Sequence, residues 1–217
     1  MTLLYLVRHG QTEWSKSGQH TSFTNLDLTD QGVEQAKGLK SRLDPSEFDL
    51  VLTSPRLRAQ KTAQLAGFTD FEVTDDLQEW NYGDYEGMTS VQIREQHPGW
   101  RLWFNGVPGG ETADQVRERL TRVVHRVRAS GVEKAICFGH GHASRVLAMC
   151  WMDFPLIFGQ AFPLEVASLS MLGREKESWA MLRWPSPPGR PAAPAAPPAA
   201  PPPGPPPPPP PPPRAPP

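Results

Sequence analysis

Short apolar runs alternate with amphipathic helical patterns along residues 1–184 of the chain. Apolar runs of this kind, bounded by polar or Gly residues, are typical of buried strands. The helical patterns between them supply the crossover connections that parallel strands need. The sequence therefore predicts an α/β layered fold with a mostly parallel sheet. We expect its strands at residues 3–7, 48–53, 71–73, 135–138, 166–172 and 179–184.

The chain changes character after Trp184. Residues 185–217 hold 21 of its 27 prolines, so we divide it into a folded domain, 1–184, and a disordered Pro/Ala-rich tail, 185–217. A tail of this composition cannot bury apolar area and favours the polyproline II conformation. The composition favours a passive extension. A partner with an aromatic-lined groove, which would bind such a tail, stays open.

Charge and apolar content exclude several protein classes. The first 184 residues carry 20 basic and 23 acidic side chains, a balance that predicts no binding to nucleic acid or to an anionic membrane. No apolar run approaches the roughly 20 residues that span a bilayer, and no secretory signal is visible. Cys137 and Cys150 lie in apolar surroundings and are expected to be free thiols in the cytoplasm.

Polar side chains follow three of the expected strands. Strand 3–7 runs into Arg8 and His9, strand 135–138 runs into His140, and strand 48–53 runs into a helix that Ser54 caps and that carries Arg58. Ligands of open parallel sheets bind beyond the carboxyl ends of the strands. If the first two strands are neighbours, about 4.8 Å apart, the two histidines face each other. Two imidazoles, two guanidiniums and a helix N-terminus favour a phosphate site without a metal.

The remaining histidines and a group of arginines have other expected roles. His140 and His142 could bind zinc, but no further donors follow at ligand spacing, so neither a metal nor a cofactor is expected. His20, His97 and His125 lack a comparable context and are expected to be structural or exposed. The arginines of the helix that Thr112 caps are expected to form a solvated face: Arg117, Arg119, Arg122, Arg126 and Arg128.

Four motifs extend over nearly all of residues 3–184: Arg8–Thr12, Ser54–Ala59, Glu79–Gly87 and Gly139–Gly141. In these motifs and in their order, the chain resembles the histidine phosphatase (phosphoglycerate mutase-like) superfamily. The resemblance implies a flavodoxin-like fold, that is a three-layer α/β/α sandwich, with a smaller cap near residues 78–110.

The resemblance also implies the roles of five residues. His9 matches the nucleophile that becomes phosphorylated, with its other ring nitrogen bonded to a backbone carbonyl. Arg8, Arg58 and His140 match the groups that hold the phosphoryl oxygens. Glu79 matches the carboxylate that protonates the leaving oxygen and later activates water.

Differences from the mutases of the superfamily favour a phosphatase. Ser15 stands where the mutases carry Asn, Glu79 begins Glu-Trp-Asn-Tyr instead of Glu-Arg-His-Tyr, and only 61 residues separate Glu79 from His140. The details are most similar to sedoheptulose bisphosphatases and small actinobacterial acid phosphatases. We therefore expect hydrolysis of a small phosphorylated metabolite, a sugar phosphate or bisphosphate. The expected substrate-binding residues are Ser15, Lys16, Tyr82, His142 and Arg145.

Two alternatives remain open from the sequence. One is phosphoryl transfer of the phosphoglycerate mutase type. The other is a catalytically inert binding module that is recruited through its Pro-rich tail. The sequence gives no indication of the oligomeric state.

Overall fold

A six-stranded sheet forms the centre of the computed structural model, which describes residues 2–186. The strand order is β3-β2-β4-β1-β5-β6, and β1, β2, β3 and β4 run parallel to one another. β5 pairs antiparallel with β1 and with β6. The strands are β1 (Leu3–Arg8), β2 (Leu50–Thr53), β3 (Glu72–Val73), β4 (Lys134–Gly139), β5 (Leu169–Glu175) and β6 (Ser178–Ser186).

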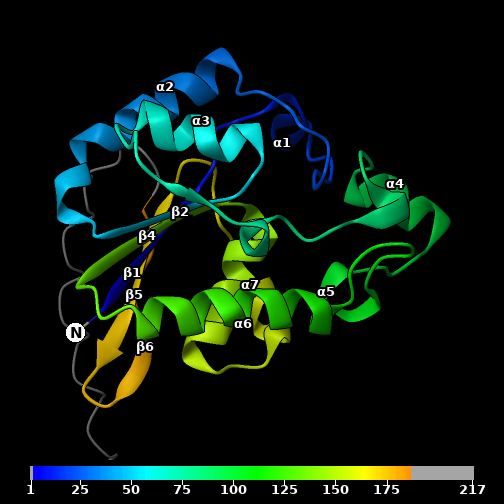
Figure 1. Ribbon diagram of the computed structural model, residues 1–217. Helices are drawn as coiled ribbons and strands as arrows, with labels where there is room; N and C mark the ends of the chain where they lie inside the picture. The colour runs from blue at the N-terminus through cyan, green and yellow to red at the C-terminus, as the bar shows by residue number, and fades with distance from the viewer. Residues whose placement is uncertain (1, 187–217) are drawn as a thin grey trace, which may run out of the picture.

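Helices cover both faces of this sheet. Figure 1 shows α2 (Asp30–Gly38) and α3 (Leu57–Leu65) on one face, and α6 (Ala113–Ala129) and α7 (Gly141–Met152) on the other. Each face has its own buried apolar cluster, with Leu39 and Phe68 on the first side and Leu120 and Leu147 on the second. The expected α/β class, with three layers and a mostly parallel sheet, is confirmed.

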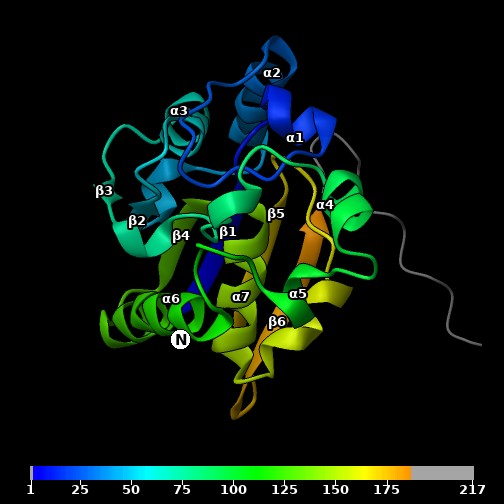
Figure 2. The same cartoon turned by 90° about the vertical axis from the view of Figure 1, so that its right-hand side faces the viewer.

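Three short helices lie beyond the end of the sheet at which β1 and β4 end. They are α1 (Glu13–Ser17), α4 (Ser90–Gln96) and α5 (Leu102–Asn105), and Figure 2 views the molecule from their side. A bridge between Gln19 and Thr89 joins the loop after α1 to the start of α4. The region of the small cap, near residues 78–110, therefore covers the carboxyl ends of the central strands.

Side-chain caps fix where the helices begin. Thr112 caps α6 as expected, and Thr29 caps α2, because each hydroxyl accepts from a backbone N–H of the first turn. The expected start of α3 was wrong. The helix begins at Leu57 rather than at Pro55, and its N-cap Arg56 makes no side-chain capping bond. The Ser54 hydroxyl lies before the helix, where it accepts from the backbone N–H of Arg56 at 3.3 Å and is hydrogen-bonded to the ring of His140 at 2.7 Å.

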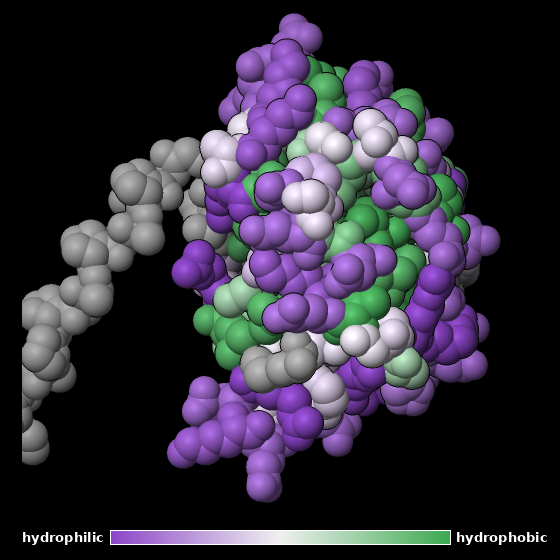
Figure 3. Space-filling view, turned by 60° about the vertical axis from the view of Figure 1, so that its left-hand side comes forward, coloured by the Kyte–Doolittle hydropathy of each residue, from purple (hydrophilic) through white to green (hydrophobic). Residues whose placement is uncertain are grey.

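The last strand extends slightly beyond the expected end of the domain. β6 continues to Ser186, which pairs with Leu169. The rest of the Pro-rich tail, and with it the expectation of disorder, lies outside the described residues. Within residues 2–186, no helix is long and apolar enough to cross a membrane. Figure 3 shows one face of the molecule, on which hydrophilic residues surround smaller apolar areas.

Candidate active site

A cavity of about 160 Å³ opens at the carboxyl ends of β1 and β4. The register pairs Arg8 with Gly139, so the next residue of each strand, His9 and His140, lies at the same edge. Their ring centroids are 5.3 Å apart, which confirms the expected neighbourhood of the two histidines. The cavity is lined by Arg8, His9, Ser15, Gly18, Gln19, His20, Thr21, Glu79, Tyr82, Gly141, His142 and Arg145.

His9 is held in one tautomer. Its Nδ1 lies 2.7 Å from the carbonyl oxygen of Gly10, which can only accept, so Nδ1 carries the hydrogen. Nε2 therefore keeps its lone pair. Burial, followed by the charges of Arg58 and Arg8, lowers the pKa of His9 well below its usual value near 6.5. A neutral imidazole with a free Nε2 is the form that attacks an electrophile.

Arg8 brings an incompletely paired cation to the cavity. One terminal nitrogen donates to the carbonyl of Leu164, whereas Nε is buried and has no hydrogen-bond partner among the described residues. Burial is the main cause that lowers its pKa, and the nearby carboxylate of Glu79 partly opposes this effect. A buried guanidinium donor without an acceptor is costly.

Arg58 and His140 are bonded to each other behind His9. Arg58 Nε donates to His140 Nδ1 over 3.3 Å, so His140 carries its hydrogen on Nε2 and donates to Ser54 Oγ. The terminal nitrogens of Arg58 donate to the carbonyls of Thr21, Ser22 and Thr24. Neither residue is among those that line the cavity. In this arrangement both residues support the wall of the cavity, and their expected contact with phosphoryl oxygens stays a prediction.

Glu79 also lines the cavity. Its carboxylate accepts three backbone N–H groups, from Trp80 at 2.9 Å, His142 at 3.0 Å and Ala143 at 2.7 Å. Two of these donors belong to the first turn of α7, where the helix dipole favours negative charge. Glu79 is only 6% exposed. The start of α7 therefore fixes the carboxylate beside Arg8 and His9.

Of the five expected substrate-binding residues, four line the cavity and one does not. Tyr82, His142 and Arg145 line the cavity, and the Tyr82 hydroxyl is 2.6 Å from Nδ1 of His142. Ser15 also lines it, but its side chain is bonded to the backbone of Thr12. Lys16 is exposed on α1 and does not line the cavity.

The structure adds one residue to the cavity and contradicts one expectation. His20 lines the cavity, with its ring centroid 4.6 Å from that of Tyr82, and burial lowers its pKa to about 4. Arg119 is buried rather than solvated, 8% exposed, and is paired with Glu111. Among residues 2–186, no group of three or more His, Cys, Asp or Glu side chains could hold a metal ion.

The buried histidines predict a loss of stability in mild acid. Burial lowers the pKa of His9, His20, His140 and His142 in the folded chain, whereas the unfolded chain titrates near 6.5. Below this pH the unfolded chain binds more protons. Each histidine that stays neutral therefore removes up to about 1.4 kcal/mol from the free energy of unfolding per pH unit.

Urea unfolding at about pH 7.5 and about pH 5 measures this effect. We expect the lower midpoint at pH 5, and a weaker pH dependence in a His20→Asn variant. Replacement of the exposed His125 serves as the control. Equal midpoints at the two pH values would contradict the assignment of neutral, buried histidines.

Comparisons with known proteins identify the family of the chain. Residues 4–187 match the family model of the histidine phosphatase superfamily, branch 1. An acid phosphatase of Mycobacterium tuberculosis is 42% identical over 79% of this chain and 86% of its own length. Sedoheptulose 1,7-bisphosphatase of Saccharomyces cerevisiae is 38% identical over 67% of this chain and 66% of its own.

Weaker relatives include mutases. A 2,3-bisphosphoglycerate-dependent phosphoglycerate mutase of Azorhizobium caulinodans is 35% identical over 68% of this chain and 80% of its own length.

The chain also superposes on solved structures. The structure of an open reading frame of Mycobacterium tuberculosis superposes with a TM-score of 0.80 at 39% identity, over 84% of this chain and 96% of that one. A mycobacterial glucosyl-3-phosphoglycerate phosphatase in complex with VO3 gives a TM-score of 0.77 at 25% identity, over 85% and 98%. The chain belongs to branch 1 of the histidine phosphatase superfamily and is a phosphoric monoester hydrolase.

Proposed function

We propose that the chain hydrolyses small phosphomonoesters, sugar phosphates or bisphosphates, through a phosphohistidine on His9 and without a metal. The observation that carries the proposal is the arrangement around His9. His9, with its unprotonated Nε2, lines one cavity together with Arg8, whose buried Nε lacks a partner among the described residues, and with Glu79. A nucleophile, a cation and a proton-transfer group in one cavity are the parts that phosphoryl transfer requires.

The first half of the reaction forms the covalent intermediate. The Nε2 lone pair of His9 attacks phosphorus while the bond from phosphorus to the ester oxygen breaks. Glu79, in its carboxylic acid form, gives its proton to the leaving oxygen, and an alcohol departs. Arg8 stabilises the charge on the equatorial phosphoryl oxygens. The bond from Nδ1 of His9 to Gly10 keeps the ring oriented throughout.

The second half returns the enzyme to its starting state. Glu79, now a carboxylate, takes a proton from a water molecule as that water attacks phosphorus. The bond between phosphorus and His9 Nε2 breaks, and inorganic phosphate leaves. The same residue serves as acid and then as base, because the two half-reactions are related by exchange of the alcohol for water.

The relatives support hydrolysis of small metabolites. The acid phosphatase and the sedoheptulose bisphosphatase share 42% and 38% identity with this chain, whereas the mutase shares 35%. Arg145 and Arg8 line the cavity with Glu79 as its only acidic lining residue among the described residues. This excess of positive charge suits a substrate with more than one anionic group.

We also propose that the enzyme works in the reducing cytoplasm. Cys137 and Cys150 are both free thiols, and a disulfide-free chain suits that compartment. Cys137 is buried, and burial raises its pKa to about 12, so its thiol is not a reactive group.

Hydrolysis of p-nitrophenyl phosphate in excess EDTA tests the metal-independent reaction. We expect an unchanged rate, because every catalytic group in the proposal is a side chain. Buffer with added Mg²⁺ or Zn²⁺ is the control. Loss of activity in EDTA that returns with a metal would overturn this mechanism, and activity under neither condition would favour the inert binding module.

Arg145 should select for substrates with a second anionic group. It lines the cavity, and among residues 2–186 its side chain donates one hydrogen bond, from Nε to the carbonyl of Gly141. We expect Arg145→Gln to lower kcat/KM for a sugar bisphosphate. The loss should correspond to about 1–3 kcal/mol of activation free energy, the scale of a charge-assisted hydrogen bond. The kcat/KM for p-nitrophenyl phosphate should be nearly unaffected. Lys37→Gln is the control, since Lys37 is exposed on α2 and does not line the cavity. Equal losses on both substrates would assign Arg145 to the primary phosphate site.

A further inference from the structure

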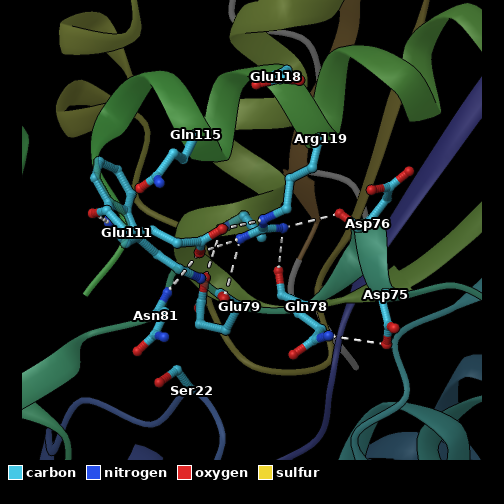
Figure 4. A network of polar contacts seen from close by, with 12 residues as sticks. Ser22, Asp75, Asp76, Gln78, Glu79, Asn81, Glu111, Gln115, Glu118 and Arg119 are labelled. Carbon is cyan, nitrogen blue, oxygen red and sulfur yellow. Dashed lines mark hydrogen bonds and ion pairs between the residues drawn. The ribbon is translucent and has the colours of Figure 1, made fainter. Parts of the chain in front are cut away.

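Arg119 is a buried arginine for which the mechanism gives no role. It projects from α6 toward the segment that carries Glu79, as Figure 4 shows. Its side chain makes five hydrogen bonds: two to the Glu111 carboxylate and three to the backbone carbonyls of Asp76, Gln78 and Glu79. A guanidinium has five N–H donors, so this side chain is saturated within the protein. It is therefore not a ligand-binding group.

Glu111 is hydrogen-bonded to the same segment. It precedes Thr112, the N-cap of α6, and its carboxylate accepts from Nε and a terminal nitrogen of Arg119 at 2.7 and 2.9 Å. The same carboxylate accepts from the backbone N–H of Asn81 at 2.8 Å, and the Glu111 carbonyl accepts from the indole of Trp80 at 2.9 Å. The pair thus bonds to the chain on both sides of Glu79. We call Glu111 and Arg119 the α6 clamp.

The segment is packed through Trp80 on one side of Glu79, but open space lies on its other side. A second cavity, of about 310 Å³, adjoins it on the side of α6 and is lined by both clamp residues and by Glu79. Without the clamp, the backbone at Glu79 could shift into this space. The carboxylate of Glu79 faces α7 and the catalytic cavity, whereas its carbonyl faces Arg119. The residue is therefore held at both ends.

We propose that the α6 clamp positions the backbone of Glu79 so that its carboxyl group reaches the leaving oxygen. This inference rests on the proposed function, in which Glu79 transfers that proton. The clamp residues are positioning residues, since they touch neither substrate nor the reacting atoms. Small misplacement of a proton-transfer group lowers the rate of the step it assists and leaves binding of the phosphoryl group largely unchanged.

An Arg119→Lys variant tests the clamp. A lysine keeps the charge but has three donors on one nitrogen, so it cannot bridge Glu111 and three carbonyls. We expect kcat/KM to fall about 10–100-fold for an alkyl phosphate and no more than about threefold for p-nitrophenyl phosphate. A phenolate leaves without much protonation, so it does not depend on the position of Glu79. If Arg119→Lys folds poorly by circular dichroism, Glu111→Gln, which keeps the shape of the side chain, should show the same selectivity to a smaller extent.

Arg122→Gln is the matched control. Arg122 lies on the same helix and bonds to the side chain of Asp76 in the same segment, but it is 55% exposed and does not contact Glu79. Exposed ion pairs contribute little to stability. We expect nearly wild-type kinetics on both substrates, because loss of this contact leaves the bonds on either side of Glu79 in place.

The same measurements in a Glu79→Gln background separate positioning of Glu79 from a general loss of structure. If the clamp acts through Glu79, Arg119→Lys should cause no further alkyl-selective loss there. Equal losses on alkyl and aryl substrates, or additive losses in the double variant, would overturn the clamp and leave the proposed function intact. If Glu79→Gln itself did not discriminate between the substrates, the proposed proton transfer would fail, and the clamp would fail with it.

Discussion

Replacement of His9 by Ala should abolish turnover of every substrate. His9 is the group that forms the bond to phosphorus, and loss of a catalytic nucleophile lowers kcat by about 10⁴–10⁶-fold. The fold should survive, because Arg8 and Gly10, on either side of His9, are held by the sheet and by the Thr62 hydroxyl, respectively. Steady-state hydrolysis of p-nitrophenyl phosphate measures the loss. His125→Ala, at an exposed position on α6, should keep full activity. A His9→Ala variant with appreciable turnover would show that another group attacks phosphorus.

Glu79→Gln should slow hydrolysis of substrates with poor leaving groups more than hydrolysis of substrates with good ones. Gln can accept the N–H of Ala143 but cannot give a proton to an alkoxide, so kcat/KM for an alkyl phosphate should fall about 10²–10⁴-fold. The fall for p-nitrophenyl phosphate should be much smaller. Because hydrolysis of the phosphoenzyme also loses its base, a burst of p-nitrophenol should precede a slow steady state.

The controls for this experiment are Glu95→Gln, an exposed carboxylate on α4, and circular dichroism of each variant. Glu95→Gln should leave both substrates at wild-type rates. If Glu79→Gln lost the same factor on alkyl and aryl phosphates, Glu79 would bind or position the substrate and would not protonate the leaving oxygen.

The fold followed from the sequence wherever one local signal decided the outcome. The apolar runs at 3–7 and 135–138 are strands because their side chains are buried on both faces of the sheet. Their carboxyl ends then place His9 and His140 together, since parallel neighbours end at the same edge. The roles of these histidines came from the family resemblance, because a residue at a strand end does not by itself define chemistry.

Helix α1 was missed for a local reason. The stretch after the first strand has no apolar period, yet Thr12 and Ser15 form a reciprocal capping box that starts a helix of five residues. The usual signature of this box has Glu or Gln at its last position, so Ser15 gave no clear signal. Its loop places His20 at the cavity, and the chain segment around His20 offers no pattern that predicts this position.

Arg119 was misjudged although the sequence carried a signal. It follows Val116 by three residues and precedes Val123 by four, which is the spacing of one helix face. Because Val116 and Val123 are buried, that spacing indicates that Arg119 is directed inward. The acceptors that make its burial tolerable are backbone carbonyls of a distant segment. No sequence pattern shows such acceptors.

Chemical trapping of the intermediate tests the central claim most directly. Wild-type enzyme is mixed with a ³²P-labelled phosphomonoester, quenched within milliseconds in base, and divided between acid and base before the label on the protein is counted. A phosphohistidine predicts label that survives base, is lost in acid and maps to the peptide containing His9. His9→Ala should carry none. Label that survives acid, or label on another residue, would contradict a mechanism in which His9 forms the bond to phosphorus.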